Sequence, residues 1–273
     1  MTRKNQKGQA VLVVLLSLSV VLIIVLFILS RSITDISLST KEEDSLRAFS
    51  AAEAGVERAL VIGNSSGSLD DAEFSALVTQ FASGADQVTY PLALKSGENA
   101  VFWFKRAGEV TQFNGSNIRF CWGNAGTNPA DSDTPALEVT FYYTTLPDDM
   151  TTLQIERAVY DPNVSRVTAN RFDNAQISSC TIGQDSFAFQ ATIDTPTGTL
   201  EYATAKLLYN TTNAHKVGIN VASTGSILPS QGEKVESAGS YGDANRSIEV
   251  YQLHPETPPI FANAIFSANG IVK

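Results

Sequence analysis

Two cysteines, Cys121 and Cys180, are the residues of this sequence whose chemistry is most easily assigned. A pair of thiols forms a disulfide in oxidising surroundings, and this pair would close a loop of about 60 residues. On the chain-entropy model such a link stabilises the fold by about 4 kcal/mol. We therefore expect a Cys121–Cys180 disulfide if this part of the chain lies outside the cytoplasm. The alternative is two separate buried thiols.

The other side chains that could bind a metal suggest at most a weak site. Two cysteines cannot supply the four ligands of a structural zinc ion, and His215 and His254 lie far from them in sequence. The segment 128–133 offers the carboxylates of Asp131 and Asp133 to calcium, but it lacks the glycine and the terminal glutamate of an EF-hand loop. A solvated turn is the favoured interpretation, and calcium is the weaker one. We expect no metal and no cofactor.

Catalytic motifs are not recognisable along the chain. It has no glycine-rich phosphate loop before a helix, no H-E-x-x-H and no G-x-S-x-G. His215 and His254 are interpreted as structural residues in loops or at strand edges. Trp103 and Trp122 are typical of a buried core, and a carbohydrate-binding platform is the alternative use of such a pair. The sequence therefore predicts a protein that is not an enzyme.

The charge balance argues against nucleic-acid binding. The chain has 19 basic and 28 acidic side chains, for a net charge of -9. Three basic residues, Arg3, Lys4 and Lys7, precede a long hydrophobic segment, and without them the net charge is -12. An acidic protein repels the phosphate backbone, so nucleic acid is not an expected partner.

The segment from about residue 10 to residue 30 has the length and composition of a membrane span. No charged side chain occurs between Gly8 and Ser30, and apolar residues occupy every helical face. Twenty helical residues are about 30 Å long, which matches the hydrocarbon thickness of a bilayer. The basic residues before the span place the N-terminus in the cytoplasm by the positive-inside rule, so the remainder of the chain is exported.

The helix is expected to continue well beyond the membrane. Residues 31–62 contain mixed charges and no proline, and Gly63 is a suitable C-terminal stop. Leu46, Phe49, Glu53, Val56 and Leu60 recur at spacings of three and four, as on one face of a helix. We expect one helix over residues 9–62, and we expect this face to contact the exported domain.

Glu53 is an unusual residue for a contact face. A buried carboxylate needs a hydrogen-bond donor or an arginine, because an unpaired one costs several kcal/mol. We favour a buried structural role in which Glu53 fixes the helix against the domain. The alternative is a solvated side chain beside Gly55 and its small neighbours.

The stretch from Arg47 to Glu57, RAFSAAEAGVE, resembles the N-terminal domain of PilX-like minor pilins. In that family an AFxAAEA motif follows an apolar helix that begins after a glycine. The resemblance covers about residues 8–60. It implies a subunit of a type IV pilus or of a related type II secretion filament, cleavage by a prepilin peptidase and methylation of the new N-terminus. Residues 1–8 then form a basic leader, and cleavage falls between Gly8 and Gln9.

Two positions depart from the family pattern. Major pilins carry glutamate at the fifth mature position, where it neutralises the N-terminal amine of a neighbouring subunit, and this chain has Val13 there. A subunit at the filament tip has no earlier neighbour, so the resemblance suggests a tip or priming subunit; a divergent lineage is the alternative. Gln9 is an unusual first mature residue.

The rest of the chain, residues 68–273, is expected to form an exported head. A short helix capped by Asp70 or Asp71 is predicted up to residue 81. Beyond it the sequence alternates short β-branched and aromatic runs with turn residues, which predicts mainly antiparallel strands. These runs are residues 101–104, 118–122, 137–143, 153–159, 187–193 and 202–209, followed by a hairpin over 235–253. The fold class is therefore α+β, with one head domain or two divided near residues 210–215.

These features predict a structural filament subunit. Its expected partners are the lipid bilayer before assembly, the prepilin peptidase, the inner-membrane pilus assembly machinery and other pilin subunits. The alternative is a permanently anchored surface-binding or adhesion protein. That alternative predicts a chain that keeps residues 1–8.

Overall fold

The computed structural model describes residues 7–106, 108–109 and 113–255, and its contacts divide the chain into two compact units. Within the described residues, unit 1 comprises residues 7–78 and 235–250, and unit 2 comprises residues 79–234 and 251–255. The sequence placed a domain seam near residues 210–215, but that segment lies inside unit 2. Each unit is described by itself below.

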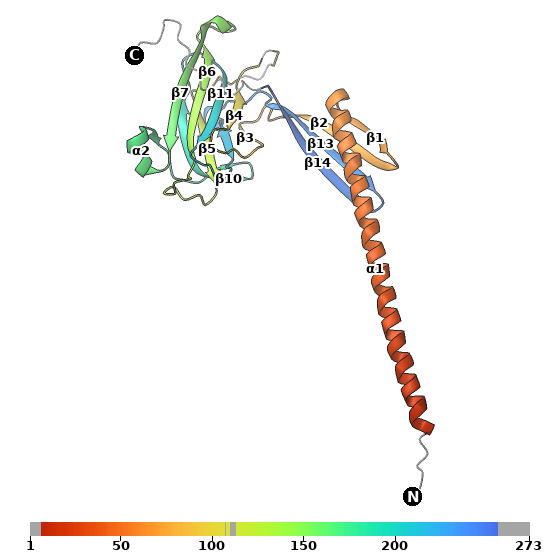
Figure 1. Cartoon of the computed structure of the whole chain (residues 1–273). Helices are drawn as coiled ribbons and strands as arrows, with labels where there is room; N and C mark the ends of the chain where they lie inside the picture. The colour runs from red at the N-terminus through yellow and green to blue at the C-terminus, as the bar shows by residue number, and fades with distance from the viewer. Residues whose placement is uncertain (1–6, 107, 110–112, 256–273) are drawn as a thin grey trace. The chain divides into compact units, whose positions relative to one another are not determined.

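Unit 1 is dominated by the helix α1, Lys7–Ile62, drawn in red and orange in Figure 1. Its 56 residues give a length of about 84 Å at 1.5 Å per residue. Gly63 ends the helix as predicted: it adopts a positive φ of 80°, and its N–H donates to the Ala59 carbonyl at 2.8 Å. A single helix therefore contains both the apolar span and the extension beyond it.

The residues after α1 form strands where the sequence had predicted a helix. β1 (Ser65–Leu69) and β2 (Ala72–Phe81) pair antiparallel across Asp70 and Asp71. Both aspartates have a positive φ, so they form a tight hairpin turn and cap no helix. The prediction was wrong because Phe74, Leu77, Val78 and Phe81 fit a helical period, whereas burial alternates with period two from Ala72 onwards.

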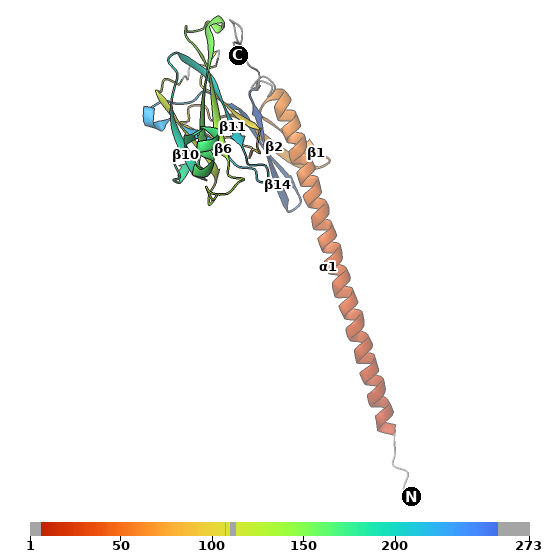
Figure 2. The same cartoon turned by 60° about the vertical axis from the view of Figure 1, so that its left-hand side comes forward.

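A second hairpin completes this sheet. β13 (Gly232–Tyr241) and β14 (Ala244–Leu253) are joined by Gly242 and Asp243, as the sequence predicted, and the strand order is β1-β2-β13-β14. Figure 2 shows the C-terminal part of α1 alongside these strands. The hairpin therefore brings residues near position 240 to the helix near position 50.

Unit 2 contains two five-stranded sheets with one core between them (Figure 1). The first sheet, in the order β3-β12-β5-β10-β9, consists of Gln87–Thr89, Val217–Asn220, Asn117–Asn124, Asp185–Asp194 and Cys180–Ile182. The second, in the order β4-β11-β6-β7-β8, consists of Asn99–Trp103, Thr199–Leu208, Ala136–Thr144, Leu153–Asp161 and Asp173–Asn174. The short helices are α2 (Val164–Asn170), η1 (Met150–Thr152) and η2 (Ala222–Thr224). Each predicted strand run falls on one of these strands.

In the described part of unit 2 the paired strands are antiparallel, except for the parallel pair β7–β8. The core between the sheets is aromatic, and its largest fully buried side chains include Phe102, Phe120, Trp122, Phe141 and Phe189. The protein is thus α+β, with one long apolar N-terminal helix and a mainly antiparallel β-rich part, as the sequence predicted.

Candidate functional site

The C-terminal half of α1 packs on the sheet of unit 1 through small side chains. The buried residues on the helix are Ala48, Ala51, Ala52, Gly55, Val56 and Ala59. They meet apolar residues of the strands in two clusters, one with Ala72 and Phe74 and one with Ala76 and Val235. Small side chains on both partners allow the two backbones to approach closely. This contact fixes the helix on its sheet.

Two glycines, one on each partner, mark the closest approach. A Cβ added at Gly239 of β13 would lie 2.0 Å from the Ala48 carbonyl oxygen and 2.6 Å from the Ala52 nitrogen. A Cβ added at Gly55 of α1 would lie 2.2 Å from Oγ of Ser237. Real Cβ atoms do not come that close to other atoms, so glycine is required at 239 by the helix backbone itself.

The structure corrects the predicted contact face. Val56 is buried, but Glu53 is exposed, and Phe49 and Leu60 are 43% and 44% exposed. The prediction followed the large side chains, whereas the sheet receives the small ones, which lie beside them on the helix surface. A repeat of Ala48, Ala52, Gly55 and Ala59 at spacings of four, three and four was the signal that could have revealed the true face.

Polar contacts reinforce the packing near the β13–β14 turn. Arg47 forms an ion pair with Glu43 at 2.7 Å and donates to the Tyr241 hydroxyl at 3.1 Å. The Glu43 carboxylate raises the pKa of Arg47, so the guanidinium keeps its charge. Arg246 on β14 donates to Oγ of Ser45 on the helix. These contacts are largely exposed, so each contributes little to the stability of unit 1. Their main effect is to specify how the helix is aligned on the sheet.

The N-terminal half of α1 has the opposite character. Its apolar side chains from Val11 to Leu29 are all exposed in the isolated chain, as are Ile33, Ile36 and Leu38 farther along. Ser17 and Ser19 donate their hydroxyls to carbonyls one turn earlier, so these polar groups are satisfied within the helix. Among the described residues, α1 is the one helix that is long and apolar enough to cross a membrane.

The predicted processing site lies at the very start of this helix. Gly8 and Gln9 are helical residues of α1, while residues 1–6 of the predicted leader lie outside the described residues. Val13 lies on the exposed apolar surface with 63% of its area accessible. No side chain in the described part of the chain covers it.

The two cysteines meet in unit 2. A disulfide links Cys121 of β5 to Cys180 of β9, with the two Cα atoms 6.0 Å apart. Both residues are buried, in a small cluster with Ile182 and Phe187. The pairing expected from the sequence is present, and it joins strands that lie on either side of β10.

The two candidate calcium ligands, Asp131 and Asp133, accept hydrogen bonds from neighbouring loop residues. Asp131 accepts a hydrogen bond from the Asn128 amide, and Asp133 accepts bonds from the backbone N–H groups of Thr212 and Asn213. Partial burial acts to raise the pKa of Asp133. The hydrogen bonds that its carboxylate accepts have the larger effect, so they hold the pKa below its usual value. Within the described part of the chain, no three His, Cys, Asp or Glu side chains are close enough to hold a metal ion.

Both histidines make hydrogen bonds within unit 2. Nδ1 of His215 accepts a hydrogen bond from the Asn124 N–H at 3.0 Å, so this ring nitrogen carries no proton and the imidazole is neutral. Burial lowers the pKa of His215, and burial together with the neighbouring Arg106 lowers that of His254.

The two tryptophans play different parts. Trp122 is fully buried, and its indole N–H donates to the Pro135 carbonyl at 2.9 Å. Trp103 on β4 lies beside Tyr202 on β11, and Tyr202 stacks on Tyr142 of β6 with ring centroids 4.3 Å apart. Because Trp122 is buried, the two tryptophans do not form an exposed carbohydrate platform together.

Comparisons with family models, curated proteins and solved structures found no match for this chain.

Proposed function

We propose that this chain is a structural, non-catalytic subunit of a filament of the type IV pilus or type II secretion class, as a minor pilin or pseudopilin. The observation that carries this proposal is the division of one continuous helix, α1, into two halves. The first half exposes apolar side chains on every face, and the second half is fixed to a sheet of its own unit. A simple membrane anchor has no need of the second half.

The proposed mechanism is assembly through α1. Before assembly the first half of the helix crosses the bilayer, with the N-terminus in the cytoplasm and both units exported. A prepilin peptidase cleaves after Gly8, and the inner-membrane assembly machinery transfers the subunit into the filament. The helix then exchanges lipid for the helices of other pilin subunits, and its apolar surface suits both surroundings. The Phe49 and Leu60 side chains, exposed in the isolated chain, add further surface for such neighbours.

We place the subunit at the tip or in the priming complex because of Val13. A glutamate at this depth would need a partner amine, since a buried charge without its partner is costly. Val13 is neutral and apolar, so it requires none. A first subunit that has no predecessor can therefore pack without an unpaired charge.

The decisive experiment is analysis of the intact mass and N-terminal peptide of the protein isolated from its native envelope. We expect a mature chain that begins at Gln9 and carries one added methyl group. Gly8→Val should block cleavage because a branched side chain replaces the smallest residue at the scissile bond. Gln6→Val, which keeps Gly8, is the matched control and should be processed normally.

A chain that retains Met1 to Gly8 in its native envelope would contradict the filament proposal. The protein would then be a permanently anchored surface-binding protein. A chain cut after residue 30 would instead identify a secretory signal.

The tip assignment has its own test. Val13→Glu should move the subunit from the tip into the shaft or should reduce piliation, as seen by immunogold labelling of filaments. Val14→Glu carries the same charge at the neighbouring position and controls for the cost of an acid in the membrane span, which for charged residues reaches about 2.5–3.5 kcal/mol at the centre of a span. Unchanged piliation and localisation for Val13→Glu would argue against the tip assignment.

A further inference from the structure

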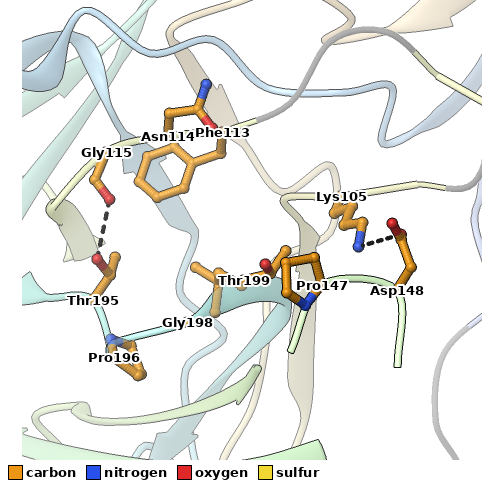
Figure 3. Close-up of a pocket in the computed structure, with 11 residues that line it drawn as sticks. Lys105, Phe113, Asn114, Gly115, Pro147, Asp148, Thr195, Pro196, Gly198 and Thr199 are labelled. Carbon is orange, nitrogen blue, oxygen red and sulfur yellow. Dashed lines mark hydrogen bonds and ion pairs between the residues drawn. The ribbon is translucent and has the colours of Figure 1, made fainter. Parts of the chain in front are cut away.

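A cavity of about 440 Å³ opens in unit 2 among four separate parts of the chain. One wall comes from Phe113, Asn114 and Gly115 before β5, and one from the turn between β10 and β11. Lys105 after β4 and Asp148 before η1 form the side opposite Gly115 and Thr195 (Figure 3). This volume falls within the range of small-molecule sites.

The walls of this cavity are held in place by hydrogen bonds. Oγ of Thr195 donates to the Gly115 carbonyl at 3.0 Å, and the Thr195 N–H donates to the Ser116 carbonyl at 2.9 Å. Gly198 has φ of 148°, and a Cβ there would lie 2.4 Å from the Thr144 carbonyl oxygen, so the β10–β11 turn sits tightly on β6. A cavity with fixed walls loses little entropy when it is filled.

The polar chemistry of the cavity centres on Lys105. Its ammonium lies 2.9 Å from the Asp148 carboxylate and 3.3 Å from that of Glu201, which also accepts from Oγ of Thr144. The hydrogen bond to Asp148 raises the pKa of Lys105, and desolvation opposes it. The side chain of Glu201 is 6% exposed, whereas that of Asp148 is 85% exposed. The register shift between Leu200 and Tyr202 places Glu201 here.

The apolar part of the lining is small and flat. The Phe113 ring packs on the buried Phe104 with centroids 5.1 Å apart, and Pro147 and Pro196 contribute two rigid rings. The Asn114 side chain is exposed and supplies both a donor and an acceptor. The cavity thus combines small apolar surfaces with hydrogen-bond donors and acceptors that lie close together.

We propose that this cavity binds a neutral saccharide. The Lys105–Asp148 pair sets a donor beside an acceptor, and a sugar hydroxyl can accept from one while it donates to the other. The apolar rings can pack against the C–H groups of the sugar. A free anion is disfavoured because Asp148 and Glu201 outnumber Lys105, and a free cation would have to displace the Lys105 ammonium from Asp148. This inference does not depend on filament assembly.

The test is saturation-transfer NMR on the full-length protein in lauryldimethylamine oxide, a detergent without a sugar headgroup. The probes are D-galactose, D-mannose and N-acetyl-D-glucosamine, each at about 10 mM so that millimolar affinity is detected. Acetate and methylamine are the charged comparison probes. We expect transfer to at least one saccharide and none to either ion.

Two surface substitutions locate the binding. Asp148→Ala and Asn114→Ala should each weaken saccharide binding about tenfold, a loss of about 1.4 kcal/mol. Both side chains are exposed, so neither variant opens a gap in the core. Asp148 has a φ of 61°, so its alanine variant should be about 1 kcal/mol less stable, and tryptophan fluorescence checks that both variants fold. Asp131→Ala, an exposed aspartate beside a different cavity, is the matched control and should bind normally.

Three outcomes would overturn the proposal. They are no transfer to any of the saccharides, saccharide binding that both cavity variants leave unchanged, and stronger binding of acetate or methylamine. Each of these results leaves the processing test of the filament proposal untouched, so the two proposals fail separately.

Discussion

Unit 1 and unit 2 bury their apolar residues in different ways. The core of unit 2 is built from large rings such as Phe102, Phe120 and Trp122, which meet edge to face or at a tilt. On the helix side, the helix–sheet contact of unit 1 is built mainly from alanine and glycine, and Phe74 is the buried aromatic residue in its clusters. A core of rings is sensitive to loss of volume, whereas a contact between backbones is sensitive to added atoms.

This difference fits the proposed roles of the units. Small residues on the inner face of α1 leave its large apolar side chains, Phe49 and Leu60 among them, pointing away from the sheet. The helix can therefore be anchored to its own sheet and still present apolar surface to other subunits. In unit 2 the largest fully buried side chains lie in the core between the two sheets.

The largest expected effect is in the core of unit 2. Phe120→Ala removes a ring that is fully buried between Phe102 and Phe141, and it should cost about 3–5 kcal/mol of unfolding free energy. Guanidinium unfolding of the full chain measures this, because Trp103 and Trp122 both lie in unit 2 and report on it. Ile177→Ala, which truncates an exposed side chain of the same unit, is the control, and an equal loss there would break the comparison.

Loss of the disulfide should lower the free energy of unfolding of unit 2 by nearly as much. Replacing Cys121 and Cys180 with alanine opens a link between residues 59 positions apart, which should cost about 4 kcal/mol on the chain-entropy model. The same fluorescence-monitored unfolding measures it, with reductant added to the native protein as a second route to the open chain. A double variant as stable as the native protein would show that the link adds nothing to unit 2.

A smaller effect is expected from one added carbon in unit 1. Gly239→Ala places its Cβ against the helix backbone at Ala48 and Ala52, which cannot rotate away, and should cost about 1–3 kcal/mol. Hydrogen exchange in peptides spanning residues 48–59 should rise, while the fluorescence transition of unit 2 stays unchanged. Ala238→Ser, which adds one atom at the neighbouring exposed position of β13, is the control and should leave exchange unchanged. Unchanged exchange for Gly239→Ala would mean that the close approach is not required.

The smallest effect should have the opposite sign. Oγ of Ser237 is buried against Gly55 and has no hydrogen-bond partner in the described structure. Because an unsatisfied buried hydroxyl is unfavourable, Ser237→Ala should leave the helix–sheet contact unchanged or stabilise it by about 0–1 kcal/mol. Slower hydrogen exchange over residues 48–59 is the expected readout. Faster exchange would indicate that the hydroxyl contributes a favourable contact.

Much of the fold could be predicted because the signals were local. The apolar run, the stop at Gly63 and the short β-branched runs each depend on neighbouring residues, and each has its counterpart in the structure. The prediction of a helix ending at residue 81 was wrong because the large residues of this segment fit both a helical period and the period of two of a strand. The choice between those periods depended on whether Asp70 and Asp71 would adopt the left-handed conformation of a hairpin turn.

The candidate sites were less predictable, because they depend on distant contacts. The sequence could pair Cys121 with Cys180 by elimination, since no other cysteine exists. It could not choose the inner face of α1, because Gly239 lies nearly 190 residues beyond the helix positions that it meets. Nor could it bring Lys105, Asp148 and Glu201 together, since they belong to three separate segments of the chain.

The sequence by itself determined the long apolar helix, its extension past residue 30 and the β-rich remainder, because hydrophobicity and period are properties of neighbouring residues. Only the tertiary structure decided that Glu53 faces solvent, that the small residues of α1 meet the sheet, and that a charged cavity opens beside β4. Those outcomes depend on how closely separate backbones approach, and that distance is set by packing between segments far apart in the chain.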